Sequence, residues 1–456
     1  MLIIQNGQLV EPEGIRRADL AVEGGLITQI ENHIKPDPGD ECLDAEGCLV
    51  FPGFIDAHTH FDMDNGVTVT ADNFDTGTAA ALVGGTTAVI DFATQNKGGS
   101  LREALAAWHG KADGNAHCDY GFHMAITDWN EEARAQLDEM MGEGVTSFKL
   151  YMAYDALRVD DAQIWDILRE MKRIGGLLGV HCENGVLVNA MVKRLREAGD
   201  LSPAAHPRSR PPEVEAEAIS RLLYIARMAE WPVNIVHLSG ALGLREVRKA
   251  RAAGQKVLVE TCPQYLLLED SRLDGPGFEG AKYVCSPPLR KREDCEALTQ
   301  ALRDGEIGTV ATDHCSYDFR GQKELGLSDF SKIPNGLPGV EHRPALLYSL
   351  VERGVISPER MCALLSATPA REYGLYPRKG ALRPGSDADI VIWEPGAFGR
   401  ITAENQRQNV DYTPFEGFAV QGRAREVLLH GQVAARKGGL VRRGLGRYVR
   451  RSKPEM

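Results

Sequence analysis

Eight short apolar runs, separated by stretches of helical character, occupy the middle of this 456-residue chain and restrict its fold more than any other feature. In order they are LVFPGFIDAH, TTAVIDFA, DYGFHMAI, TSFKLYM, GLLGVHCE, PVNIVHLS, KVLVETC and IGTVATDHC. One of the intervening helices is expected over residues 212–230, where Pro212 suits the first turn. Apolar strands that alternate with amphipathic helices are typical of a parallel α/β architecture. Eight of them predict a (β/α)8 TIM barrel, although the pattern alone also permits a nine-stranded doubly wound sheet.

Both ends of the chain consist of short strand-like segments joined by turns. LIIQNGQLV and ADLAVEGGLITQIE stand near the N-terminus, and ADIVIWEP and AREVLLHGQVAARKGG follow about residue 380. Two terminal β segments around a long α/β middle predict one small β-sandwich domain formed by both termini. We therefore expect residues 1–50 and 376–456 to form that domain and residues 51–375 to form the barrel.

Polar side chains end several of the eight apolar runs. His58 and His60 close the first run, Lys149 lies in the fourth, and His181, His237 and Asp313 end the fifth, sixth and eighth. In a TIM barrel the C-terminal ends of the strands meet at one face, where active sites are built. His58 and His60 are two residues apart on an extended segment, so both side chains point the same way and can bind one metal ion. With two later histidines and an aspartate, this pattern predicts a metal centre.

Lys149, in SFKLYMAY, lies inside an apolar strand, where an ammonium without a partner is costly and its pKa is lowered. One interpretation is an ordinary ion pair with a carboxylate such as Asp313. The neutral amine, however, is the form that reacts with CO₂. Beside four histidines and one aspartate we favour a carbamylated lysine that bridges two metals, because the set otherwise lacks a bridging anion.

Charge and composition narrow the class of partner. A net charge of −12 argues against a chain-wide affinity for nucleic acid or anionic membranes and leaves small molecules as the expected partners. The opening residues lack a signal-peptide pattern and no apolar window is long enough to span a bilayer, so we expect a cytoplasmic protein. Nine cysteines without CxxC spacing predict reduced, mostly buried thiols.

The order His-x-His, Lys, His, His, Asp on this strand pattern resembles the amidohydrolase superfamily. Longer motifs resemble its D-hydantoinase and dihydropyrimidinase family: PGFIDAHTH, GTTAVIDF, SFKLYMAY, VHCENG, VHLSG, ETCPQYL, SPPLR, ATDHC and PNGLPGVEHR. The resemblance continues through PAREYGLYPRKGALRPGSDADIVIW and YTPFEGF, so it covers nearly the whole chain.

This resemblance implies a binuclear metal centre. His58, His60 and Asp313 would hold the more buried ion, His181 and His237 the other, and Lys149, as N6-carboxylysine, would bridge them. Two divalent ions per subunit, zinc or else manganese or cobalt, about 3.5–4 Å apart, would share a hydroxide that acts as the nucleophile. Asp313 would act as general base toward the water and then as general acid toward the leaving ring nitrogen.

Three further residues match family positions that contact the substrate. Tyr154 would donate to the developing oxyanion, and Ser286 and Asn335 would recognise the imide or ureide edge of the ring, largely through backbone groups. The alternatives are a packed core aromatic for Tyr154 and ordinary turn residues for Ser286 and Asn335.

The implied activity is hydrolysis of a cyclic amide, a dihydropyrimidine or a 5-monosubstituted hydantoin, to an N-carbamoyl amino acid by a homotetramer. An allantoinase or a dihydroorotase would share the metal ligands, but a dihydroorotase would need a cationic site for the substrate carboxylate. A non-catalytic scaffold of the same fold is the alternative from another class. Scaffold relatives lack the ligands, all six of which are present here.

The loops expected to cover the ring substituent are polar. They supply Asp64, Asn65, Thr94, Tyr151 and Arg158. We therefore expect a bulky apolar substituent on the ring to be bound less favourably.

Other residues near the ligands have simpler interpretations. His314 is either a supporting residue for Asp313 or a strand neighbour that points away, and Cys182 and Cys315 are expected not to bind metal. The run from Arg436 to Lys453 holds eight Lys or Arg and no acidic residue. It is expected either to be a solvated tail or to contact a neighbouring subunit.

Overall fold

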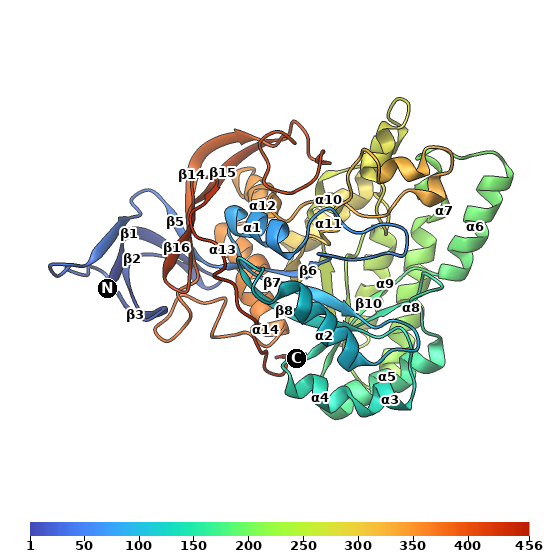
Figure 1. Cartoon of the computed structure of the whole chain (residues 1–456), viewed down its shortest axis with the longest axis horizontal. Coiled ribbons are helices and arrows are strands. Elements are labelled where there is room, and N and C mark those ends of the chain that lie inside the picture. The colour runs from blue at the N-terminus through green and yellow to red at the C-terminus, as the bar shows by residue number, and fades with distance from the viewer. Residues whose placement is uncertain (456) are drawn as a thin grey trace.

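The computed structural model describes residues 1–455 and contains a barrel of parallel strands beside a separate sheet built from both ends of the chain (Figure 1). This arrangement confirms the predicted fold class.

The barrel strands follow one another in sequence order, from the first to the eighth. They are β6 (Phe54–Thr59), β7 (Thr86–Thr94), β8 (Asp119–Ala125), β9 (Ser147–Tyr151), β10 (Leu177–His181), β11 (Val233–Ile235), β12 (Val257–Thr261) and β13 (Thr309–Val310). Nearly every residue in them is buried, as expected when helices cover the outside and side chains fill the interior. The first and last strands approach each other where the His60 N–H donates to the carbonyl of His314 at 2.8 Å, which nearly closes the barrel.

Helices cover the outside of the barrel (Figure 1). They are α1 (Phe74–Gly84), α2 (Leu101–Ala112), α3 (Glu131–Ala135), α4 (Leu137–Gly142), α5 (Asp161–Ile174), α6 (Gly185–Glu197), α7 (Ala205–Ser209), α8 (Pro212–Ala229), α9 (Ala241–Ala252), α10 (Pro263–Leu267), α11 (Arg292–Arg303), α12 (Arg343–Glu352), α13 (Pro358–Cys362) and α14 (Thr368–Glu372). Single turns are η1 (Asp270–Asp274), η2 (Glu279–Tyr283), η3 (Lys323–Gly326), η4 (Phe330–Lys332) and η5 (Ala363–Ala367). None of the helices within residues 1–455 is long and apolar enough to cross a membrane.

Local sequence fixes several helix ends. Asn73 and Thr76 form a capping box at the start of α1, and Asp160 and Gln163 form another at the start of α5. The predicted helix over 212–230 is α8, which starts with a proline in its first turn and ends where Glu230 turns left-handed at φ 54°.

The second sheet joins the two ends of the chain. Its strands are β1 (Leu2–Glu11), β2 (Gly14–Glu23), β3 (Leu26–Glu31), β4 (Glu41–Asp44), β5 (Leu49–Pro52), β14 (Ile390–Arg400), β15 (Ala419–Leu429), β16 (Gln432–Arg436) and β17 (Gly439–Leu440). They lie in the order β17-β16-β15-β14-β5-β1-β2-β3, with β4 beside β1. Because β5 pairs with both β1 and β14, the N-terminal and C-terminal strands, blue and red in Figure 1, share one sheet.

The first predicted strand, LVFPGFIDAH, is divided between the two sheets. Its first part is β5 of the terminal sheet, and its second part is β6 of the barrel. Gly53 separates them, and its N–H donates to the carbonyl of Asp389 at 2.7 Å. A Cβ at this position would collide with the side chain of Thr87, so only glycine fits here.

The end of the basic C-terminal segment packs against the barrel of the same chain, whereas seven of the eight basic side chains in the segment are exposed, so the expectation of a solvated tail is correct only in part. The Tyr120 N–H donates to the carbonyl of Arg447 at 3.0 Å, and the Val449 N–H donates back to Tyr120 at 2.8 Å. Arg451 is buried, with its guanidinium donating to Ser147 Oγ at 2.8 Å and to the carbonyl of Phe122. The guanidinium thus supplies donors to oxygens of two neighbouring barrel strands, β8 and β9.

Candidate metal centre and active site

The six predicted metal ligands lie toward the C-terminal face of the barrel. His58, Lys149 and His181 lie in β6, β9 and β10, and His60, His237 and Asp313 lie in the segments that follow β6, β11 and β13. Four of the six are buried, whereas the side chains of His60 and Asp313 are 11% and 14% exposed. The site is therefore most accessible beside these two residues.

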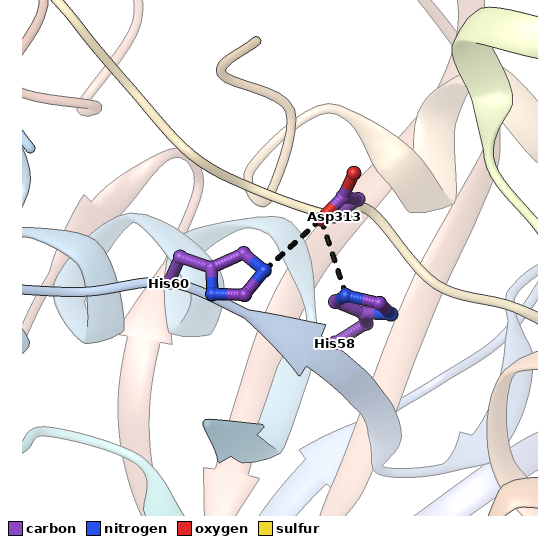
Figure 2. A group of neighbouring side chains, drawn as sticks. All are labelled: His58, His60 and Asp313. Atoms are coloured by element: carbon purple, nitrogen blue, oxygen red, sulfur yellow. Dashed lines mark ion pairs between the residues drawn. The ribbon is translucent and has the colours of Figure 1, made fainter. Parts of the chain in front are cut away.

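His58, His60 and Asp313 form one compact group (Figure 2). Nε2 of each histidine lies 3.2 Å from Oδ1 of Asp313. Burial alone would raise the pKa of Asp313, but the neighbouring imidazoles, His58 foremost, hold it well below its usual range. One potential ligand atom from each of the three residues lies within 4.8 Å of the others, which is the spacing needed to bind one ion.

His181 and His237 form a second group beside the first. Nδ1 of His181 lies 3.0 Å from Nε2 of His237, and the ring centroids of His58 and His237 are 5.5 Å apart. Burial lowers the pKa of both His181 and His237, so both rings are neutral near pH 7. Neutral imidazole is the form that binds metal.

Lys149 is buried among aromatic rings and the two histidine groups. Its Nζ lies 4.8 Å from the centroid of the Phe92 ring and 5.3 Å from that of Tyr151. In the described part of the chain no ion pair joins it to a carboxylate, so the alternative of a salt bridge with Asp313 is not observed. Burial lowers the pKa of Lys149 to about 8, which leaves a substantial neutral fraction at mildly alkaline pH.

Two buried carboxylates that sequence reasoning missed orient the histidines. Oε1 of Glu260 lies 2.7 Å from Nδ1 of His58, and Oε2 of Glu183 lies 2.8 Å from Nε2 of His181. Arg210 in turn donates to Glu183 at 2.6 Å. A carboxylate on one ring nitrogen leaves the other free for a metal. Glu260 lies within the seventh apolar run, where no ligand was predicted, and a charged residue inside an apolar strand is the signal that could have found it.

The backbone at the site is held in an uncommon conformation. Tyr154, His237 and Asp313 have φ of 66°, 39° and 52°, in the left-handed region that residues other than glycine seldom adopt. Such conformations cost free energy and persist where the surrounding structure enforces them, often at functional sites.

The three predicted substrate-contacting residues have neighbours in or next to the candidate ligand group. The Tyr154 ring centroid is 5.3 Å from that of His181. Burial raises the pKa of Tyr154 to about 12, although Arg210 and the nearby Ser286 moderate the rise, so the phenol keeps its proton. Ser286 is buried, and Asn335 is partly exposed at the end of a loop that meets the segment after β13, where Cys315 Sγ donates to its carbonyl at 3.7 Å.

His314 and the two cysteines beside ligands take structural roles. Nε2 of His314 lies 3.1 Å from Asp72, and its Nδ1 accepts the N–H of Gly339 at 3.0 Å, so the ring joins loops and points away from the metal ligands. Cys182 Sγ donates to the carbonyl of Val180. All nine cysteines are free thiols and eight of them are buried, which confirms that prediction.

Several of the predicted polar loop residues have partners of their own. Asp64 and Asn65 are exposed, and the Asn65 amide donates to the hydroxyl of Tyr317 at 3.2 Å. Arg158 is exposed and pairs with Asp155 at 2.8 Å. Thr94 is partly exposed, and Tyr151 is buried against Lys149.

A second acidic group lies away from the site, where the barrel meets the terminal sheet. Asp119, Asp387 and Asp389 gather there, and the ammonium of Lys379 lies 2.6, 3.1 and 2.5 Å from their oxygens. The lysine occupies the position that a cation would take, so this group is a buried ion-pair network.

Comparison with known proteins gives consistent matches. The model of the Amidohydrolase family matches residues 49–434. A D-hydantoinase of Geobacillus stearothermophilus is 44% identical over 455 residues, which is 99% of this chain and 96% of the relative. A D-hydantoinase of Streptomyces coelicolor is 43% identical, over 99% and 98% of the two chains. The crystal structure of dihydropyrimidinase from Brevibacillus agri superposes with a TM-score of 0.97 at 42% identity, over 99% of both chains.

Proposed function

This chain belongs to the amidohydrolase family, as a hydrolase of the D-hydantoinase type that acts on cyclic amides, and from that premise we propose a specific reaction. It opens the ring of a dihydropyrimidine or a 5-monosubstituted hydantoin to give an N-carbamoyl amino acid. The observation that carries the proposal is the convergence of the six predicted ligand residues from five strand ends, with Asp313 in contact with both His58 and His60. Residues 51–375 are proposed as the hydrolase domain, and residues 1–50 and 376–456 as the second domain of a homotetramer.

The residues present fit a binuclear metal centre. Nδ1 of His58 is held by Glu260, and the buried Nε2 of the same ring faces Oδ1 of Asp313 at 3.2 Å, so this nitrogen and this carboxylate oxygen are placed to bind one ion. His58, His60 and Asp313 would hold one ion, and His181 and His237 the other. Lys149, as N6-carboxylysine, would bind both. When bound, two divalent ions, zinc or else manganese or cobalt, would lower the pKa of a shared water and supply hydroxide near neutral pH.

Asp313 is proposed to handle the proton. Its carboxylate is ionised because the adjacent imidazoles lower its pKa, and it lies at the accessible side of the group. It accepts the proton of the attacking water and delivers it to the ring nitrogen that leaves when the amide C–N bond breaks.

Tyr154, Ser286 and Asn335 are proposed to bind the ring. The protonated phenol of Tyr154 donates to the carbonyl oxygen as negative charge develops there, which lowers the barrier most if the donor is already in place. Backbone N–H and C=O groups at Ser286 and Asn335 complement the alternating donors and acceptors of a cyclic diamide.

A substrate panel tests this function. Dihydrouracil, hydantoin, 5-phenylhydantoin, allantoin and dihydroorotate are incubated with the protein, and the ring-opened products are separated by chromatography. We expect dihydrouracil and hydantoin to be opened, and 5-phenylhydantoin more slowly, because Asp64, Asn65 and Arg158 make the substituent side polar. A strong preference for 5-phenylhydantoin would contradict the polar-pocket argument, and turnover of allantoin or dihydroorotate alone would contradict the proposed substrate class.

A further inference from the structure

Lys323 is a buried ammonium bound only by backbone carbonyls. It begins η3 and is 0% exposed. Its Nζ donates to the carbonyls of Val284, Pro334 and Gly336 at 2.9, 2.7 and 2.8 Å. A lysine ammonium has three donors and no acceptor, so each proton has one carbonyl. In the described chain no carboxylate pairs with it, and the three carbonyls take the place of water around the ammonium.

The three carbonyls come from the two segments proposed to recognise the substrate ring. Val284 lies two residues before Ser286, and Pro334 and Gly336 flank Asn335. The Gly336 N–H also donates to the carbonyl of Val284 at 3.1 Å. One ammonium therefore holds together two segments about fifty residues apart in the sequence, and it fixes the distance between their backbone groups.

Lys323 is itself anchored to the segment that carries Asp313. Its backbone N–H donates to the carbonyl of Asp318 at 2.9 Å, and its Nζ lies 5.9 Å from the ring centroid of Tyr317. The segment after β13 thus places Asp313 at one end and the ammonium of Lys323 at the other. Lys323 therefore links the position of the two proposed ring-binding segments to that of Asp313, the proposed proton-transfer group.

We propose that Lys323 is a positioning residue for substrate recognition, because it sets the spacing between the backbone groups of Ser286 and Asn335. This inference rests on the proposed function, which gives those two residues their role. Lys323 does not touch the substrate. Loss of its ammonium leaves the carbonyls of Pro334 and Gly336 without this donor and that of Val284 with only the Gly336 N–H, and the two segments separate to reach water or other donors. The ring then binds less tightly, while the metal ligands stay in place.

The test compares Lys323→Met with Lys332→Met. Lys332 is exposed in the same region of the chain, so the control carries the same substitution without the buried contacts. For the cyclic amide that the wild type opens, we expect Lys323→Met to raise KM at least about tenfold with kcat within about threefold, the signature of lost uniform binding. Metal content per subunit should equal that of the wild type. Lys332→Met should match the wild type in KM, kcat and metal content.

Hydrogen exchange provides a second readout that needs no turnover. Amides in residues 282–288 and 333–338 should exchange faster in Lys323→Met than in Lys332→Met. A folded Lys323→Met protein with KM within about twofold of the wild type, or with unchanged exchange in both segments, overturns the inference. If Lys323→Met does not fold, Lys323→Arg decides by the same KM criterion, because a planar guanidinium cannot direct its donors as the ammonium does. A wild type that opens no cyclic amide refutes the proposed function instead, and the exchange comparison still decides whether Lys323 holds the segments.

Discussion

The carboxylate of Glu260 lies 2.7 Å from Nδ1 of His58, and it thereby directs Nε2 of that ring toward Asp313. Glu183 stands in the same relation to His181, with the opposite ring nitrogen. Both carboxylates are fully buried, so each histidine is fixed in tautomer and orientation before any ion binds.

Glu260→Gln should weaken metal binding about 10- to 100-fold, because the neutral amide is a poorer acceptor for the imidazole N–H and lowers the basicity of the ring. Metal retention is measured during titration with a chelator. Glu183→Gln should weaken the ion held by the other two histidines, and Glu197→Gln, an exposed position on α6, should behave as the wild type. Retention equal to the wild type in both buried variants would contradict the orienting role.

Asp313→Asn should reduce kcat by about 10²- to 10⁴-fold while the protein stays folded, because the amide cannot accept the proton of the attacking water. Thermal unfolding and steady-state kinetics are measured on the same preparation. Asp304→Asn, at the exposed end of α11, is the matched control. A kcat within about threefold of the wild type would exclude Asp313 as the proton acceptor, and would return a non-catalytic scaffold to consideration if the wild type is also inactive.

Reactivation of metal-depleted protein should depend on pH through Lys149. Burial lowers the pKa of its amine to about 8, so about half of the amine is neutral near pH 8 and roughly 1% near pH 6. Activity should return faster near pH 8 when zinc and bicarbonate are added together. Lys149→Gln should not recover at either pH, and exposed Lys193→Gln should recover normally. Recovery independent of bicarbonate would contradict a carbamate on Lys149.

Glu372→Gln should stabilise the protein at alkaline pH. Burial, and next the charge of Glu260, raise the pKa of Glu372 to about 8 from its ordinary value of 4.5. The folded state therefore binds the proton more tightly than the unfolded state, and the resulting stability is present below about pH 4.5 and lost as pH rises toward 8. The glutamine variant keeps a neutral side chain, so its advantage in free energy of unfolding should grow between pH 5 and pH 9, by on the order of a few kcal/mol. The growth is measured as an increasing difference in Tm between the variant and the wild type. An equal Tm difference at both ends would show that Glu372 does not titrate in this range.

The barrel and the gathering of the candidate ligands toward one of its faces were predictable because each signal is local. Every strand is an apolar run, and His58, His181 and Asp313 stand at or just after the end of one. Glu260 and Lys323 acquire their roles only through contacts made by folding. Lys323 lies in the polar stretch GQKELG, which resembles any surface turn, and its three acceptors are backbone carbonyls that carry no sequence signal. Arg451 was interpreted as part of a solvated or intersubunit tail for the same reason.

The most direct test of a binuclear cyclic amidase is the metal content per subunit of protein purified without chelator. The same sample is assayed for ring opening of dihydrouracil and 5-phenylhydantoin. We predict about two divalent ions per subunit together with turnover, fastest on dihydrouracil. Protein that holds no metal and gains no activity from zinc, manganese or cobalt with bicarbonate would contradict a binuclear cyclic amidase.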